Sequence, residues 1–192
     1  MCVVGHDRLV GMSATKNQVH HSPLGEAEKV LHFLWPQFVV ENGMVLLARH
    51  AGSNPCPSGT LTDWESFINH THVFDEFSSE SEAVRQSTVS HDEIEITYDE
   101  RHPDFLAACR LGKTAARLWA MKLKEDFPDE RFRVYYTQYD NPIVRFHKVR
   151  EDEAPWLPDE AITTARGDLR NALVFDSQRS AFPVSTSEGR IH

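Results

Sequence analysis

The sequence predicts an α+β fold, with a mostly antiparallel sheet of five to six strands, one long helix and two or three short ones. Three features support this prediction. Asn42-Gly43 stands between two apolar runs, and both residue types tolerate the positive φ of a type I′ hairpin turn. A second pair of strand-like runs flanks Asp140-Asn141. Between them, residues 103–126 show the apolar spacing of a long helix.

The chain has 192 residues, 40% hydrophobic and 26% charged, which suits one globular domain with tails. We expect a mobile N-terminal arm over residues 1–21, a single α+β domain over 22–177 and a C-terminal tail over 178–192. The arm shows no periodicity. Met12 stands in a context typical of a natural start, so we hypothesise that the native protein begins there and that the first eleven residues are an over-extended start.

Several protein classes are disfavoured by composition. No apolar run approaches the ~20 residues of a membrane helix, and the first 25 residues lack the basic and apolar regions of a signal peptide. The three cysteines, Cys2, Cys56 and Cys109, are too few and too far apart for a disulfide framework or a metal clip. We therefore expect a cytoplasmic protein with no membrane partner and no cofactor.

The net charge of −9 makes this an acidic protein, but the charge is unevenly placed. Residues 61–104 carry twelve acidic and two basic residues, whereas 105–150 carry ten basic and five acidic ones. We expect these segments to neutralise one another across the fold. The alternatives are a basic face for an anionic ligand and an acidic face for a basic partner. Nucleic acid is not expected, because no Lys/Arg-rich run with interleaved aromatic residues is present.

The first elements follow from local signals. Ser22 and Pro23 suit the start of a helix that Pro36 ends. The strands on either side of Asn42-Gly43 are apolar on both faces, so we expect them to be covered on each side. After a loop over residues 51–60, Thr60 and Asp63 form the pattern of a capping box that opens a short helix.

The middle of the chain is less regular. The stretch over 70–77 is ambiguous between helix and strand, and residues 77–92 are polar and expected to be exposed. Residues 93–98 alternate as in an edge strand. The long helix over 103–126 then presents a face of small residues, which predicts close approach to a sheet: Ala108, Cys109, Gly112, Ala115 and Ala116.

The second hairpin, over residues 131–150, provides the candidate site. A two-residue turn at Asp140-Asn141 places Tyr136, Gln138, Arg145 and His147 on one side of the hairpin. Arg145 would fork a carboxylate while Tyr136 and Gln138 donate hydrogen bonds beside it. The alternative is a solvent-facing sheet surface with ordinary cross-strand pairs. A linker around Trp156, a short helix over 158–166 and a last strand over 172–176 complete the domain.

Motifs of known chemistry are weak. Cys2-x-x-Gly5-x-x-Arg8 has the spacing of a phosphatase loop, but no strand precedes it to position the thiol. His70 and His72, with Asp75 and Glu76, could seat a metal ion with help from elsewhere, yet eleven histidines among 29 acidic residues produce such clusters by chance.

The sequence therefore favours a binding or protein-interaction module whose surface, for a small anionic ligand or a protein partner, lies on the second hairpin. The alternative is a small enzyme acting on an anionic small molecule. It would use Arg145 to bind and His147 for acid–base work, with assistance from a metal at His70 and His72.

Overall fold

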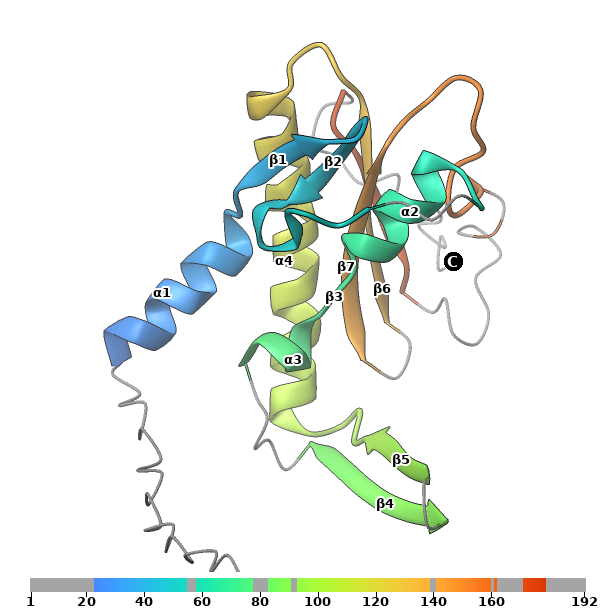
Figure 1. Ribbon diagram of the computed structural model, residues 1–192. Coiled ribbons are helices and arrows are strands. Elements are labelled where there is room, and N and C mark those ends of the chain that lie inside the picture. Colours follow the sequence, from blue (N-terminus) through green and yellow to red (C-terminus); the bar gives the residue numbers. More distant parts are fainter. Residues whose placement is uncertain are drawn as a thin grey trace, which may run out of the picture.

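Helix α4 (Pro103–Asp126) packs across one face of a four-stranded antiparallel sheet in the computed structural model of this protein (Figure 1). The strand order is β3-β7-β6-β8. These strands are β3 (Thr71–His72), β6 (Phe132–Gln138), β7 (Pro142–Lys148) and β8 (Leu173–Asp176).

The structure describes residues 23–54, 58–77, 83–90, 93–138, 141–159, 161 and 171–178. Of residues 84–90 and 93–95 it describes the backbone alone. The expected arm over 1–21 lies outside these residues, as do the tail beyond 178 and most of the expected helix over 158–166.

The predicted α+β fold with antiparallel pairing is confirmed. Among the described residues, the strands are distributed over one sheet of four and two sheets of two. One hydrophobic core joins them, and its centre lies where the aromatic and aliphatic side chains of β6 and β7 meet α4.

The first hairpin forms its own small sheet after helix α1 (Pro23–Leu34). Strands β1 (Phe38–Glu41) and β2 (Met44–Leu47) are joined by Asn42 and Gly43, whose φ angles of 51° and 77° are those that a type I′ turn requires. The expectation that both strands are covered on each side is wrong for β1. Strand β2 is buried throughout, but β1 lies at an edge, and Val40 is 63% exposed.

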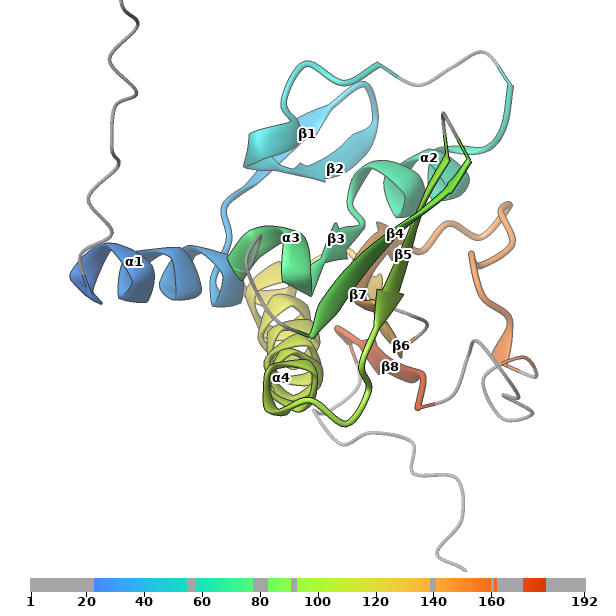
Figure 2. The same ribbon diagram turned by 90° about the horizontal axis from the view of Figure 1, so that it is seen from below.

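Helix α2 (Leu61–Ile68) follows the short 3₁₀ turn η1 (Ala48–His50) and begins with the predicted capping box. The Thr60 hydroxyl accepts from the Asp63 N–H at 3.1 Å, while Asp63 Oδ2 accepts from the Thr60 N–H at 3.1 Å. The helix packs on β7 from the side opposite α4 (Figure 2).

The ambiguous segment after α2 contains both kinds of structure. It forms the two residues of β3 and then helix α3 (Val73–Phe77). Beyond it, β4 (Val84–Ser90) and β5 (Glu93–Tyr98) make a hairpin that projects beyond the first turn of α4 (Figure 1). Only β5 is predicted from the sequence, because the segment that forms β4 is polar and lacks a hydrophobic face.

The small-residue face of α4 contacts the sheet as predicted. A Cβ added at Gly112 would lie 2.9 Å from Cε2 of Tyr136 on β6, closer than real Cβ atoms approach another atom. Glycine at this position therefore lets the aromatic ring lie directly against the helix backbone.

Candidate functional site

The register of the β6–β7 hairpin decides which side chains share a face. Gln138 pairs with Pro142, so the loop between the two strands has three residues and not the predicted two. Tyr136 therefore pairs with Val144, and Tyr135 with Arg145. The predicted register is thus wrong by one residue. Because side chains alternate along a strand, this shift splits the four predicted site residues into two pairs on opposite faces.

Tyr136 and Gln138 lie on the face that α4 covers. The Tyr136 ring is buried against Gly112, and its hydroxyl donates to Gln138 Oε1 at 3.3 Å. Burial raises the pKa of Tyr136 far above its usual value. Its buried ring is part of the core, so it does not stand beside Arg145 as the sequence suggested.

Arg145 and His147 share the opposite face with Tyr135. The His147 ring is 1% exposed and stacks on Tyr135 with the ring centroids 5.5 Å apart. Nδ1 donates to the Lys148 carbonyl at 2.9 Å, so Nε2 accepts from the Tyr135 hydroxyl at 2.9 Å and from the Trp156 N–H at 3.4 Å. Burial lowers the pKa of His147 to about 4, which keeps the imidazole neutral at pH 7.

Arg145 occupies a different environment from the neighbouring cations. Its guanidinium lies 3.9 Å from the centroid of the Trp156 ring, a cation–π contact. Its buried Nε has no hydrogen-bond partner, and among the described residues it forms no ion pair. Arg133 on the same hairpin pairs with Asp159 at 2.9 Å. Burial lowers the pKa of Arg145 to about 10, so it remains a cation at pH 7 without an acidic partner among these residues.

A pocket of about 360 Å³ lies beside this cation, between α2 and the Trp156 segment. Its lining residues are Ser58, Gly59, Asp63, Trp64, Phe67, Arg145 and Trp156. The Trp64 and Phe67 rings meet edge to face with centroids 5.9 Å apart, and Trp64 Nε1 donates to the Ser58 carbonyl at 2.9 Å. Three aromatic walls around one guanidinium make a site of mixed apolar and cationic character.

Gly59 fits closely under one of these walls. It adopts a φ of 103°, and a Cβ there would lie 3.3 Å from Trp64 Nε1. Sequence reasoning missed Trp64, Phe67 and Trp156 as site residues. Phe67 is 63% exposed on a short amphipathic helix, and an exposed aromatic side chain is a signal of a binding site. The sequence alone does not give this signal, because it does not show which side of α2 is buried.

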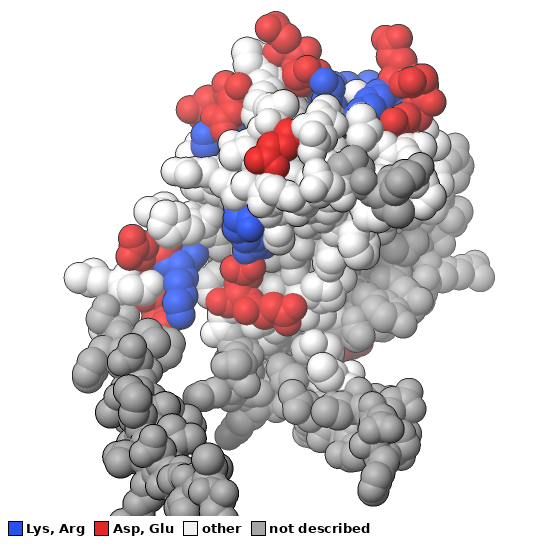
Figure 3. Space-filling model, in the orientation of Figure 1, with Lys and Arg blue, Asp and Glu red and all other residues white. Residues whose placement is uncertain are grey.

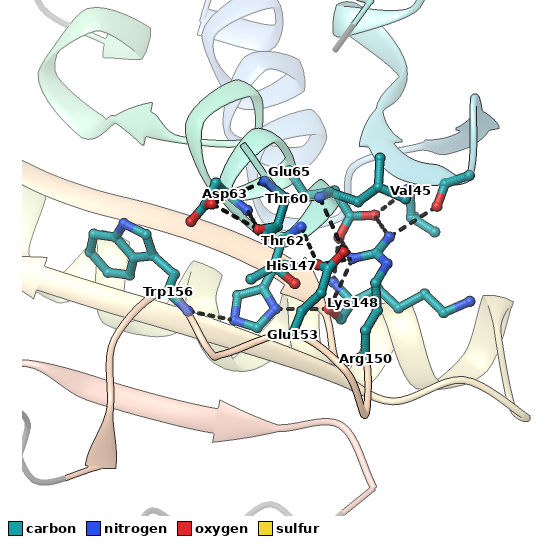
Figure 4. Close-up of polar contacts among 12 residues, drawn as sticks. Val45, Thr60, Thr62, Asp63, Glu65, His147, Lys148, Arg150, Glu153 and Trp156 are labelled. Atoms are coloured by element: carbon teal, nitrogen blue, oxygen red, sulfur yellow. Dashed lines mark hydrogen bonds and ion pairs between the residues drawn. The ribbon is translucent and has the colours of Figure 1, made fainter. Parts of the chain in front are cut away.

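A buried ion pair fixes α2 above β7 (Figure 4). Glu65 is fully buried, and its two oxygens accept from Arg150 Nη1 and Nη2, each at 2.9 Å. The same carboxylate accepts the backbone N–H groups of Val45 and Lys148 at 2.7 Å. One side chain of α2 therefore connects β2, β7 and the segment after β7.

The first turn of α2 has a second anchor. The Glu153 carboxylate accepts the N–H groups of Leu61 at 3.3 Å and Thr62 at 2.8 Å, which satisfies free donors at the helix start. In Figure 4, Asp63 and Trp156 lie at one end of this polar cluster and Arg150 at the other. The pocket is thus bordered by a helix that is held at both its beginning and its middle.

The pairing of Glu65 with Arg150 also bears on charge. Glu65 belongs to the acidic segment 61–104 and Arg150 to the basic segment 105–150. On the face shown in Figure 3, acidic and basic groups are interspersed. The pair of Glu65 and Arg150 is one contact between the two segments, and their overall neutralisation stays a prediction.

The predicted histidine pair does not line the pocket, although the His70 ring contacts that of Phe67, a lining residue, with centroids 5.7 Å apart. The His70 and His72 rings are in contact with centroids 5.2 Å apart, and His70 Nδ1 is bonded to the Phe67 carbonyl. Glu76 forms an ion pair with Arg49. Within the described ranges, no group of three or more His, Cys, Asp or Glu side chains is arranged to hold a metal ion.

Comparison with known proteins gives no functional guide: no protein family, curated protein or solved structure matches this chain. Among its described residues, no helix has the length and apolar character needed to span a membrane.

Proposed function

We propose that the protein is a binding module that takes a small anionic ligand with an apolar body in the pocket between α2 and Trp156. The observation that supports this most is the state of Arg145, a partly buried cation stacked on an indole with no acidic partner among the described residues. Holding a charge away from water is costly. A ligand carboxylate or phosphate would supply the missing counter-charge.

The pocket favours a small ligand over a flat protein surface. Its volume of about 360 Å³ lies within the range of known small-molecule sites, and three of its seven lining residues are aromatic. Trp64, Phe67 and Trp156 would contact the apolar body of the ligand, and Arg145 would bind its charged end. This keeps Arg145 in the predicted role, while the three aromatic residues take the place of Tyr136 and Gln138.

An enzyme using Arg145 and His147 stays a prediction without further support. His147 does not line the pocket, and both of its ring nitrogens are engaged by protein groups. General acid–base catalysis requires a group within hydrogen-bond reach of the ligand. The binding role does not require His147 to reach the ligand.

The test is a calorimetric titration of the full chain with benzoate, 3-phenylpropanoate and phenyl phosphate. We expect 3-phenylpropanoate to bind, and Arg145→Met to weaken it by about tenfold or more, since a charge-assisted hydrogen bond contributes about 1.5–3 kcal/mol. Arg117→Met, on the exposed face of α4, is the matched control and leaves affinity unchanged. Equal binding by Arg145→Met, or failure of every carboxylate and phosphate probe, including the amino acid tested below, would refute the proposal.

A further inference from the structure

The pocket contains a second charge that a simple anion would not use. Asp63 lines it together with Arg145. Both hydrogen bonds that the Asp63 side chain accepts, from the Thr60 N–H at 3.1 Å and the Thr60 hydroxyl at 2.8 Å, end on Oδ2. Its other oxygen, Oδ1, accepts no hydrogen bond within the described part of the chain.

The protonation state of Asp63 suits an acceptor of hydrogen bonds. The hydrogen bonds from the Thr60 hydroxyl and N–H lower the pKa of Asp63. The carboxylate is therefore ionised at neutral pH. Because it also closes the capping box of α2, its place at the pocket is set by the helix start.

The two opposite charges line one pocket but do not neutralise each other. Asp63 and Arg145 form no ion pair within the described part of the chain, since the Arg145 guanidinium lies on Trp156 and the Asp63 carboxylate on Thr60. Each is held in place by a different neighbour. Trp64 and Phe67 line the same pocket as these two charges.

From this arrangement we infer that the ligand is a zwitterion, an α-amino acid with an aromatic or large apolar side chain. The inference rests on the proposed function and narrows its ligand class. Arg145 binds the α-carboxylate, Asp63 accepts from the α-ammonium group, and the aromatic walls contact the side chain. The volume of about 360 Å³ lies at the small end of ligand sites and suits a single amino acid.

Asp63 also acts against competing ligands. A carboxylate in the pocket repels a dianion such as a phosphate monoester and leaves an unpaired charge when the ligand has no ammonium group. The site would therefore select the zwitterion over anions of the same shape, and the preference would depend on Asp63 alone.

The experiment compares three probes of one shape by calorimetry on the full chain. L-Phenylalanine carries both charges. 3-Phenylpropanoate lacks the ammonium group, and L-phenylalaninamide lacks the carboxylate and so resembles the first residue of a peptide. We expect L-phenylalanine to bind at least about tenfold more tightly than either analogue.

Asp63→Asn removes the charge while its amide oxygen still accepts from Thr60. It should abolish the preference for L-phenylalanine over 3-phenylpropanoate, with an unchanged far-UV circular dichroism spectrum. Asp75→Asn, an exposed acid on α3, is the matched control and retains the preference.

The outcomes separate the two proposals. Equal affinity for L-phenylalanine and 3-phenylpropanoate overturns the zwitterion but leaves the anion-binding function standing. A preference that survives in Asp63→Asn, or equal binding of L-phenylalaninamide, also overturns it. If neither carboxylate binds the unmodified protein, both proposals fall together.

Discussion

Glu65 and Arg150 form a bidentate ion pair in which the Glu65 carboxylate is fully buried. The pair connects the middle of α2 to the chain just after β7. Arg150 also donates to the Gly43 carbonyl at 2.9 Å, so the turn of the first hairpin belongs to the same network. Three parts of the chain that are far apart in sequence meet at this pair.

Arg150→Met is expected to destabilise the protein by about 3–5 kcal/mol, because it leaves the Glu65 carboxylate buried without its counter-charge. Adding Glu65→Gln should recover part of the loss, since the amide is neutral and its oxygen still accepts a backbone N–H. Urea unfolding measures both. Arg117→Met serves as the exposed control, with an effect within about 0.5 kcal/mol. A loss from Arg150→Met no larger than the control would contradict the role given to the pair.

The buried His147 predicts a pH dependence of stability. Its pKa is about 4 in the folded protein and 6.5 in the unfolded chain. The unfolded chain therefore takes up a proton first as pH falls, so the stabilisation is complete above about pH 6.5 and is lost between pH 6.5 and 4. The loss is roughly 3 kcal/mol for a shift of this size.

His147→Asn should flatten the stability profile between pH 6.5 and 4, because the new side chain does not titrate there. Its amide N–H can still donate to the Lys148 carbonyl. His32→Asn, at an exposed position of α1, should leave the slope as it is. Denaturant unfolding at half-unit pH steps makes the comparison, and the same slope in His147→Asn and the unmodified protein would argue against a neutral, buried His147.

Gly112→Ala is expected to destabilise the protein by about 1–3 kcal/mol, although alanine is the better helix former, because its Cβ would overlap the Tyr136 ring. In a Tyr136→Leu background the same change should cost less, since the ring is gone. Thermal unfolding of the unmodified protein, the two single variants and the double variant measures the coupling between the two positions. A higher melting temperature for Gly112→Ala alone would show that the helix and ring do not meet as described.

The sequence predicted the elements whose signals are local. The long helix from Pro103, the capping box of Thr60 and the turn at Asn42-Gly43 each depend on a few neighbouring residues, and all three are confirmed. The polar strand β4 was missed because the polar segment over 84–90 lacks the alternation that identifies a half-buried strand.

The candidate site was predicted less well, because it depends on register. The extra residue in the β6–β7 loop moves Tyr136 to the α4 face and puts Tyr135 beside Arg145. Asp63 and Trp64 join Arg145 only through the packing of α2 on β7, which no local pattern indicates. Arg145 was identified from its residue type, and its surroundings required the three-dimensional structure.

Helix α2 has one further consequence for the first hairpin. Besides the Glu65 bond to Val45, Asn69 accepts from the Leu47 N–H and donates to the Val45 carbonyl, both at 2.9 Å. These side chains occupy hydrogen-bonding groups along β2 that could otherwise recruit a strand from another molecule. Removing them would leave the apolar edge of β2 without hydrogen-bond partners. Such variants should therefore self-associate as well as lose stability.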